Sequence, residues 1–256
     1  MTGLVIEETI GAVRLIRLNR PEARNAFNEA LLSSLAAALQ RAANDDAIRC
    51  TVVTGNEQAF GAGGDIPEMA ATSPVGIWRS ERHKWWATIH DFPKPLIAAV
   101  NGLALGGGCE FALAADIVVA GDNARFGLPE IKLGFVPGRG GTQRLPLAVG
   151  KPLAMWMILT GQTMDAARAL QAGLVLEICP LAEMLPRALA IAAMIAEQPP
   201  VAAQIAKSLV KRSASPGLQD GMMAERHGYE FLLGTADAQE GMAAFIERRP
   251  PVFTGN

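Results

Sequence analysis

The chain has 256 residues, half of them hydrophobic, and a formal net charge of −2 at neutral pH. This length can bury a large core in one domain, or in one domain with an appendage. The balanced charge and the lack of a basic stripe along any helical pattern predict that it does not bind nucleic acid. Since no run of about twenty apolar residues escapes a charge or a helix breaker, we also expect no membrane span.

The three cysteines and the N-terminal 23 residues indicate in which cellular compartment the protein is found. Cys50, Cys109 and Cys179 lie in apolar runs without metal-like spacing, and an odd number of buried thiols is typical of a reducing environment. Residues 1–23 carry acids where a signal peptide would be basic and then apolar. We therefore expect a cytoplasmic protein.

Short β-prone runs alternate with helical patterns through the first 120 residues. The predicted strands cover residues 4–8, 13–18, 50–54, 96–100 and 117–120. The first two are joined through Gly11 as a hairpin, and Asn28 is placed to cap a helix over 29–43. A second helix is predicted over 75–90. This alternation predicts an α/β layer architecture with a largely parallel sheet.

The pattern after Gly150 is almost wholly helical, with one β-prone exception at 175–178. Long helices are predicted over residues 181–197, 201–212, 218–233 and 237–248, with the breaker run 213–217 between the second and the third. We therefore predict two regions, an α/β core over residues 1–195 and a helical region over 196–256.

One stretch carries the features of a reaction site. Gly106, Gly107 and Gly108 follow a β-prone run, and glycines at a strand-to-helix turn let backbone N–H groups approach a bound group closely. Glu110 then falls in the first turn of an otherwise apolar helix, and Glu130 follows in a Gly-Leu-Pro-Glu turn. Taken singly, glycine pairs usually make turns and a lone glutamate is usually a capping or solvated residue. Two acids near a glycine-framed turn instead suggest acid–base chemistry.

Five segments of the chain resemble the enoyl-CoA hydratase (crotonase) family, in the family's order and over nearly the whole chain. They are FGAGGDIPEM (60–69), KPLIAAVNGLALGGGCEFALAADIVVA (94–120), FGLPEIKLGFVPGRGGTQRLPLAVG (126–150), LTGQTMDAARALQAGLV (159–175) and EGMAAFIERR (240–249). The resemblance implies a spiral of ββα units with a helical C-terminal region that builds homotrimers or homohexamers. Strand–helix alternation alone does not distinguish this spiral from a doubly wound sheet.

The resemblance also implies a chemistry, in which an acyl-CoA thioester binds and its enolate is stabilised. The donors to the enolate oxygen would be the backbone N–H groups of Gly64 and Gly107, because preorganised donors stabilise developing charge. Glu110 would be the base that activates water, and Glu130 the acid that protonates the α-carbon. Having both acids favours reversible hydration of a trans-2-enoyl-CoA to a 3-hydroxyacyl-CoA. An enoyl-CoA isomerase, another crotonase-type activity and a non-catalytic acyl-CoA-binding protein stay as alternatives.

Coenzyme A, as part of the substrate, would lie along two segments. The resemblance assigns its contacts to Arg24, Ala26, Ala62, Gly64, Asp65, Ile66 and Gly107. Pro67 stands where relatives often have a basic residue, so Arg24 or the pair Arg248–Arg249 would supply positive charge instead. Solvated surface arginines are the alternative.

The aromatic and metal-ligating residues give weaker signals. Trp85 and Trp86 fall where the family walls its acyl pocket, although aromatics at helical spacing are more often core. The three histidines have no metal-binding spacing, so we expect no metal. GAGGDI and PGRGG miss the spacing of dinucleotide and P-loop motifs, so no further cofactor is expected. Acyl chain length, the direction of the reaction, and a place in fatty-acid, amino-acid or aromatic degradation stay open.

Overall fold

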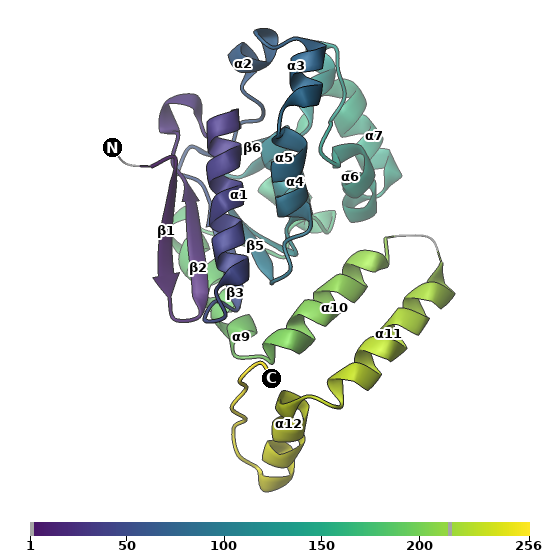
Figure 1. Cartoon of the computed structure of the whole chain (residues 1–256). Helices are drawn as coiled ribbons and strands as arrows, with labels where there is room; N and C mark the ends of the chain where they lie inside the picture. The colour runs from purple at the N-terminus through teal and green to yellow at the C-terminus, as the bar shows by residue number, and fades with distance from the viewer. Residues whose placement is uncertain (1–2, 215–216) are drawn as a thin grey trace.

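The computed structural model describes residues 3–214 and 217–256, and its centre is a six-stranded sheet (Figure 1). In spatial order the strands are β1 (Val5–Ile10), β2 (Val13–Leu18), β3 (Cys50–Thr54), β5 (Leu96–Val100), β7 (Ile117–Gly121) and β10 (Glu177–Cys179). The first two form the predicted antiparallel hairpin, and Gly11 turns it with a φ of +57°. All other neighbours pair in parallel, so the predicted largely parallel sheet is confirmed.

A second sheet of four strands shows how the chain is wound. It contains β4 (Ala59–Gly61), β6 (Leu103–Leu105), β8 (Arg125–Gly127) and β9 (Thr163–Asp165). The strands β3, β5 and β7 of the larger sheet are each followed directly by a strand of the smaller one and then by a helix. This repeat is the ββα spiral, and it is not a doubly wound single sheet. The expectation of one β-prone run after Gly150 was wrong, because the three-residue strand β9 is too short to show a period.

Both faces of the larger sheet are covered. Alternate strand residues point to opposite faces, so Val53 packs with helix α1 (Glu29–Asn44) while Val52 packs with helix α9 (Leu181–Ala196). Asn28 caps α1 as predicted, its side chain accepting a hydrogen bond from the N–H of Leu31 at 2.9 Å. Burial on both faces explains why the central strands are continuous apolar runs.

The other helices of the α/β body are short. In chain order they are η1 (Pro21–Ala23), α2 (Ile66–Ala70), α3 (Pro74–Arg79), α4 (Arg82–His90), α5 (Gly107–Ala114), η2 (Pro129–Leu133), α6 (Gly141–Val149), α7 (Lys151–Thr160) and α8 (Ala166–Gln171). The single helix predicted over 75–90 is therefore wrong, since Ser80 is extended between α3 and α4, with a ψ of 155°. The break coincides with a long-range contact that the local sequence does not show. Just after it, the buried Arg82 forms ion pairs with Glu29 and Glu68.

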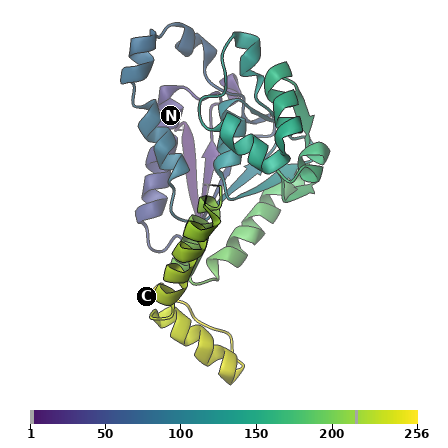
Figure 2. The ribbon, with the colours of Figure 1, turned by 90° about the vertical axis from the view of Figure 1, so that its right-hand side faces the viewer.

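Three helices, α10 (Pro200–Arg212), α11 (Leu218–Leu232) and α12 (Ala236–Glu247), extend away from this body (Figures 1 and 2). Helix α10 is anchored by the buried Lys207, whose ammonium lies 2.8 Å from the carboxylate of Asp116. Of the predicted breaker run 213–217, residues 215 and 216 lie outside the described residues. The division of the chain into residues 1–195 and 196–256 stays a prediction.

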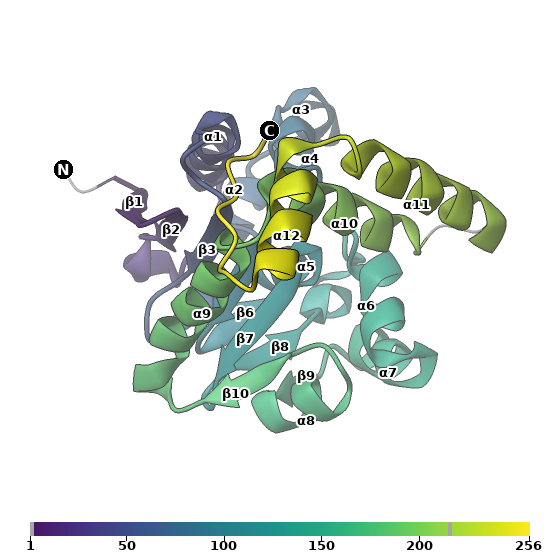
Figure 3. The same ribbon diagram turned by 90° about the horizontal axis from the view of Figure 1, so that it is seen from below.

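The C-terminal tail returns toward the body beside α9 and α12 (Figure 3). Arg49 donates hydrogen bonds to the carbonyl of Phe253 at 2.7 Å and to that of Ala196 at 3.2 Å. Among the described residues, no single helix is long and apolar enough to cross a membrane. Helices α9 and α10 meet such a test only as a pair, and they are bent by 110° at their junction.

Candidate active site

Glu110 is the most deeply placed acid of the site. It stands in the first turn of α5 and is 3% exposed. Its Oε1 atom accepts hydrogen bonds from the backbone N–H of Arg139 at 2.6 Å and of Gly141 at 3.0 Å. Burial raises the pKa of this carboxyl, while the two N–H donors act in the opposite direction because they favour the charged form.

Glu130 faces the same space from helix η2. The pKa of its carboxyl is raised to about 7, mainly by burial and in smaller part by the charge of Glu110. Its Oε2 atom is buried and has no hydrogen-bond partner within the described ranges. A carboxyl that keeps its proton near neutral pH and has a free buried oxygen is suited to act as an acid toward a bound molecule.

Two glycine loops meet beside these acids. The loop that contains Gly106 packs backbone to backbone on the loop before α2, since an ideal Cβ on Gly106 would lie 3.3 Å from the Cα of Gly63. Among the described residues, no acceptor is hydrogen-bonded to the N–H of Gly64 or to that of Gly107. Gly107 is the first residue of α5, and the first N–H groups of a helix have no partner inside it. The structure therefore brings two free backbone donors next to two acids.

These groups face one cavity of about 380 Å³. The cavity is lined mostly by apolar side chains, including Phe27, Ile66, Met69, Trp86 and Leu133. Two charged side chains, Arg82 and Arg139, also line it. A concave apolar site with a few convergent polar groups is the usual form of a small-molecule site.

The residues expected to contact coenzyme A divide into two groups. Ala62 and Ile66 line the cavity together with Gly64 and Gly107. Arg24 and Ala26 are not among its lining residues, although the carbonyl of Arg24 accepts a hydrogen bond from the N–H of Ala62 at 3.0 Å and so holds the loop. Asp65 is also outside the lining. It caps α2 and lies 2.6 Å from the guanidinium of Arg20, a structural role that accounts for both of its oxygens.

The two tryptophans singled out from the sequence differ in position. Trp86 is 4% exposed and lines the cavity, with its ring 5.9 Å from that of Phe27. An ideal Cβ on Gly107 would lie 3.5 Å from the indole of Trp86, so this ring flanks the glycine donor. Trp85 packs against the core instead. The sequence identified Trp85 and Trp86 as candidates for the pocket wall. The packing of α4 on α1 and α5 decided that Trp86 faces the cavity.

The sequence did not identify the two charged side chains of the lining other than the glutamates. Arg82 and Arg139 each reach the cavity from a segment that was read for other features. Arg139 lies in PGRGG, within the segment 126–150 that resembles the family, and a charged residue inside this glycine-rich motif was the available signal. Burial lowers the pKa of its guanidinium. Arg82 gave no local signal, because its partners are distant in sequence.

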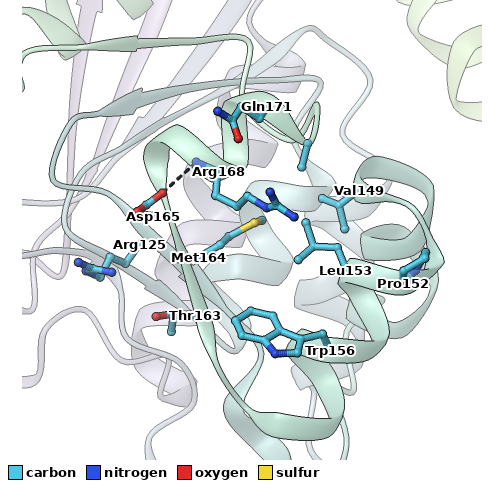
Figure 4. Close-up of a pocket in the computed structure, with 11 residues that line it drawn as sticks. Arg125, Val149, Pro152, Leu153, Trp156, Thr163, Met164, Asp165, Arg168 and Gln171 are labelled. Atoms are coloured by element: carbon cyan, nitrogen blue, oxygen red, sulfur yellow. Dashed lines mark hydrogen bonds between the residues drawn. The ribbon is translucent and has the colours of Figure 1, made fainter.

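A second hollow of about 840 Å³ lies on another part of the surface, beside α7 and α8 (Figure 4). Asp165, its one carboxylate among the described lining residues, accepts a hydrogen bond from the N–H of Arg168 at 2.8 Å as the cap of α8. This hollow has no pair of acids and no free glycine donors in its lining. The cavity of about 380 Å³ is therefore the better candidate for the active site, although its volume is smaller.

No cluster of three or more metal-ligating side chains occurs in residues 3–214 and 217–256. The thiol of Cys109, beside Glu110, is fully buried, and burial raises its pKa. A thiol in this state is a poor nucleophile. The cavity's own polar groups are its two carboxyl groups, its backbone donors and the two arginines of its lining.

Comparison with known proteins agrees with this geometry. A family model described as enoyl-CoA hydratase/isomerase matches residues 8–256. The chain is 49% identical over 243 residues to the 2,3-dehydroadipyl-CoA hydratase of Escherichia coli strain K12, with 95% of each chain covered. It is 44% identical over 241 residues to the mitochondrial enoyl-CoA hydratase of Pongo abelii, covering 94% of this chain and 83% of that protein.

Solved structures agree over the same length. The crystal structure of an enoyl-CoA hydratase from Bacillus anthracis superposes with a TM-score of 0.94 at 34% identity, and covers 99% of this chain and 100% of its own. An enoyl-CoA hydratase from Mycobacterium tuberculosis H37Rv superposes with a TM-score of 0.90 at 34% identity, with full coverage of both chains. The ββα spiral and its C-terminal helices are therefore shared with these proteins.

Proposed function

Because the chain belongs to the enoyl-CoA hydratase/isomerase family, we propose that it reversibly hydrates a trans-2-enoyl-CoA to a 3-hydroxyacyl-CoA. That it is an enzyme of the enoyl-CoA hydratase type follows from its identity of 49% and 44% to hydratases over nearly its whole length. The observation that supports the specific reaction is the facing pair Glu110 and Glu130 beside two free glycine N–H groups.

The two acids differ in the way the reaction requires. Burial raises the pKa of both carboxyls, but Glu110 accepts two backbone hydrogen bonds that offset part of this rise. We therefore assign Glu110 the role of the base, which takes a proton from water as the water oxygen bonds to the β-carbon. Glu130, with a pKa of about 7, gives its proton to the α-carbon. The proton that Glu110 has taken then passes back to Glu130 or to solvent, so the sum of the steps is addition of one water.

The N–H groups of Gly64 and Gly107 would stabilise the transient enolate. As electrons of the double bond move toward the thioester carbonyl, its oxygen becomes negative, and fixed donors stabilise this charge without reorganising. Removing one such donor in other enzymes typically costs a hundredfold or more in rate. The reaction transfers no electrons, so we propose no redox cofactor and no metal, with coenzyme A entering only as part of the substrate.

The test is the loss of the conjugated thioester absorbance of crotonyl-CoA. We expect the wild-type protein to turn over, and Glu110→Gln and Glu130→Gln each to lower kcat by roughly 10²- to 10⁴-fold. Glu22→Gln, whose side chain is 70% exposed, is the matched control. An isomerase would instead convert 3-enoyl thioesters without forming a hydroxyl product. Acyl-CoA binding without any turnover would favour a non-catalytic binding protein.

We further propose that the C-terminal region assembles the chain into a homotrimer or a homohexamer. Large apolar side chains stand exposed on α11 and α12, among them Met222, Phe231, Phe245 and Ile246. Large apolar side chains exposed in this number on two helices are what an interface between copies of the chain would cover. A cytoplasmic location stays a prediction, which fractionation of the native host would test.

The names of the relatives leave the acyl group open. One is a hydratase of 2,3-dehydroadipyl-CoA, a thioester with a second carboxylate, while others are named only enoyl-CoA hydratases. The lining residues that face the acyl end of the substrate, away from the thioester, would therefore select the substrate.

A further inference from the structure

Two guanidinium groups line the acyl cavity, and they differ in their partners. Arg82 is 8% exposed and forms ion pairs with Glu68 and, at 3.2 Å, with Glu29. Arg139 also faces the cavity, and its guanidinium has no ion pair and donates no hydrogen bond to any residue in the described part of the chain. One arginine is therefore satisfied by the protein and the other is not.

The environment of Arg139 is unfavourable for an unpaired cation. Burial lowers the pKa of the Arg139 guanidinium, and the nearby positive charge of Arg82 lowers it further. Glu110 is an opposing charge, but its Oε1 atom is bonded to the backbone N–H groups of Arg139 and Gly141 and not to the guanidinium. A partly buried charge without a partner is costly unless an anion binds to it.

Arg139 begins beside the reaction centre, because its backbone N–H lies 2.6 Å from Glu110 Oε1, and it lines the same cavity as Arg82 of helix α4. Trp86 flanks the glycine donor at Gly107, and Arg82 stands four residues earlier, about 6 Å away along the helix axis. An extended chain of five bonds spans about 6 Å at the ~1.2 Å per bond of extended backbone. Arg139 lies close enough to Arg82 to feel its charge. A carboxylate on a short acyl group bound in this cavity would therefore lie near guanidinium groups of its lining.

We propose that Arg139 is a specificity-determining residue that binds a carboxylate at the far end of the acyl chain. The substrate class is then a coenzyme A thioester of a short 2-enedioic acid, and this assignment rests on the proposed function. A guanidinium binds a carboxylate through two parallel charge-assisted hydrogen bonds, which a neutral methyl end cannot replace. The apolar wall around Trp86 and Phe27 would hold the methylene groups between the two ends.

The experiment compares two substrates that differ only at the far end. Initial hydration rates are measured with hex-2-enoyl-CoA and with its ω-carboxyl counterpart, for the wild type, Arg139→Gln and Arg139→Lys. Arg168→Gln, an exposed arginine of the other hollow, is the control. The same four proteins are titrated calorimetrically with the two saturated thioesters, whose binding needs no turnover.

We expect the wild type to prefer the ω-carboxyl substrate. Arg139→Gln should lower kcat/KM for that substrate by about ten- to a hundredfold, the range of a hydrogen bond to a charged group. For the neutral substrate the fall should be several-fold smaller, because the variant keeps the backbone N–H that holds Glu110. Arg139→Lys should recover part of the loss because it keeps the charge, and Arg168→Gln should match the wild type.

Two outcomes would overturn this assignment. Equal preference of the wild type for both substrates would show that no carboxylate is recognised. An equal fall for both substrates in Arg139→Gln would mean that the guanidinium acts on Glu110 instead. If neither substrate is hydrated, the proposed function fails, and the calorimetric preference for the ω-carboxyl thioester still decides the role of Arg139.

Discussion

The carboxylate of Glu110 accepts a hydrogen bond from the backbone N–H of Gly141 at 3.0 Å, which joins the first turn of α5 to the first turn of α6. A helix N-terminus stabilises a negative charge placed there, because its first N–H groups are free. The contact therefore fixes the position of the acid and favours its ionised form. Several consequences can be measured.

Replacing Gly141 by alanine should displace Glu110. The added Cβ would lie 2.8 Å from Pro137 Cβ, 2.9 Å from Leu128 Cδ1 and 3.1 Å from Glu110 Oε1, all closer than ordinary contacts. We expect a loss of about 1–3 kcal/mol in the free energy of unfolding and a fall in kcat of roughly tenfold or more, since the base moves off its position. Denaturant unfolding and crotonyl-CoA hydration measure the two effects.

Gly138→Ala is the matched control for stability. Its ideal Cβ meets no atom within 4 Å, and its φ is not positive, so we expect unfolding within about 0.5 kcal/mol of the wild type. If Gly141→Ala were as stable and as active as the wild type, the close packing around Glu110 would not hold in solution.

The raised pKa of Glu130 predicts a pH dependence of the rate. The acid must be protonated to donate to the α-carbon, and its pKa is about 7. Hydration at saturating substrate should therefore fall as the pH rises through about 7, and Glu130→Gln should lose this limb of the profile. A wild-type rate that stays flat from pH 6 to 9 would contradict Glu130 as the acid.

The raised pKa of Glu130 also predicts that the folded protein loses stability as the pH rises. Acids whose pKa is lowered by folding have the opposite effect. The folded pKa of Glu130, about 7, lies above the ordinary pKa of 4.5 for a glutamate, so between these two pH values the unfolded chain loses a proton that the folded chain keeps. This term makes the wild type less stable as the pH rises through that window. The Tm of Glu130→Gln relative to the wild type should thus increase from pH 5 to pH 8. A difference in Tm independent of pH would count against a buried, proton-retaining Glu130.

Trp86 and Trp78 should respond very differently to truncation. Trp86 is 4% exposed and packs between Phe27 and His90, with ring centroids at 5.9 and 5.6 Å. Trp86→Ala should lower the free energy of unfolding by about 3–5 kcal/mol and raise KM, because the cavity loses a wall. Trp78 is 80% exposed, so Trp78→Ala should stay within about 0.5 kcal/mol. Similar losses in the two variants would contradict this packing of α4.

The exposed apolar residues of α12 should control assembly. Phe245 is 86% and Ile246 is 79% exposed on the single chain. If they are covered by a second copy, light scattering should give three or six chain masses for the wild type. A double substitution of these residues to aspartate should then lower the mass, since buried unpaired charges are costly. A wild-type protein that is monomeric at micromolar concentration would rule out the proposed assembly.

The sequence alone predicted most of the secondary structure and the acids of the candidate site. Central strands such as Cys50–Thr54 are buried on both faces and so read as unbroken apolar runs. The cap at Asn28 and the glycines before α5 are local signals, because turn and cap geometry depends on neighbouring residues. Family resemblance supplied the spiral, which alternation did not.

Only the tertiary structure decided which groups meet. Residues 110, 139 and 141 are joined by hydrogen bonds between segments about thirty positions apart, and Arg82 finds Glu29 across 53 residues. The division of residues 74–90 into two helices and the short strand β9 were also decided by the tertiary structure. Local propensity depends on residues a few positions away, whereas burial, ion pairing and a raised pKa depend on neighbours that only the fold brings together.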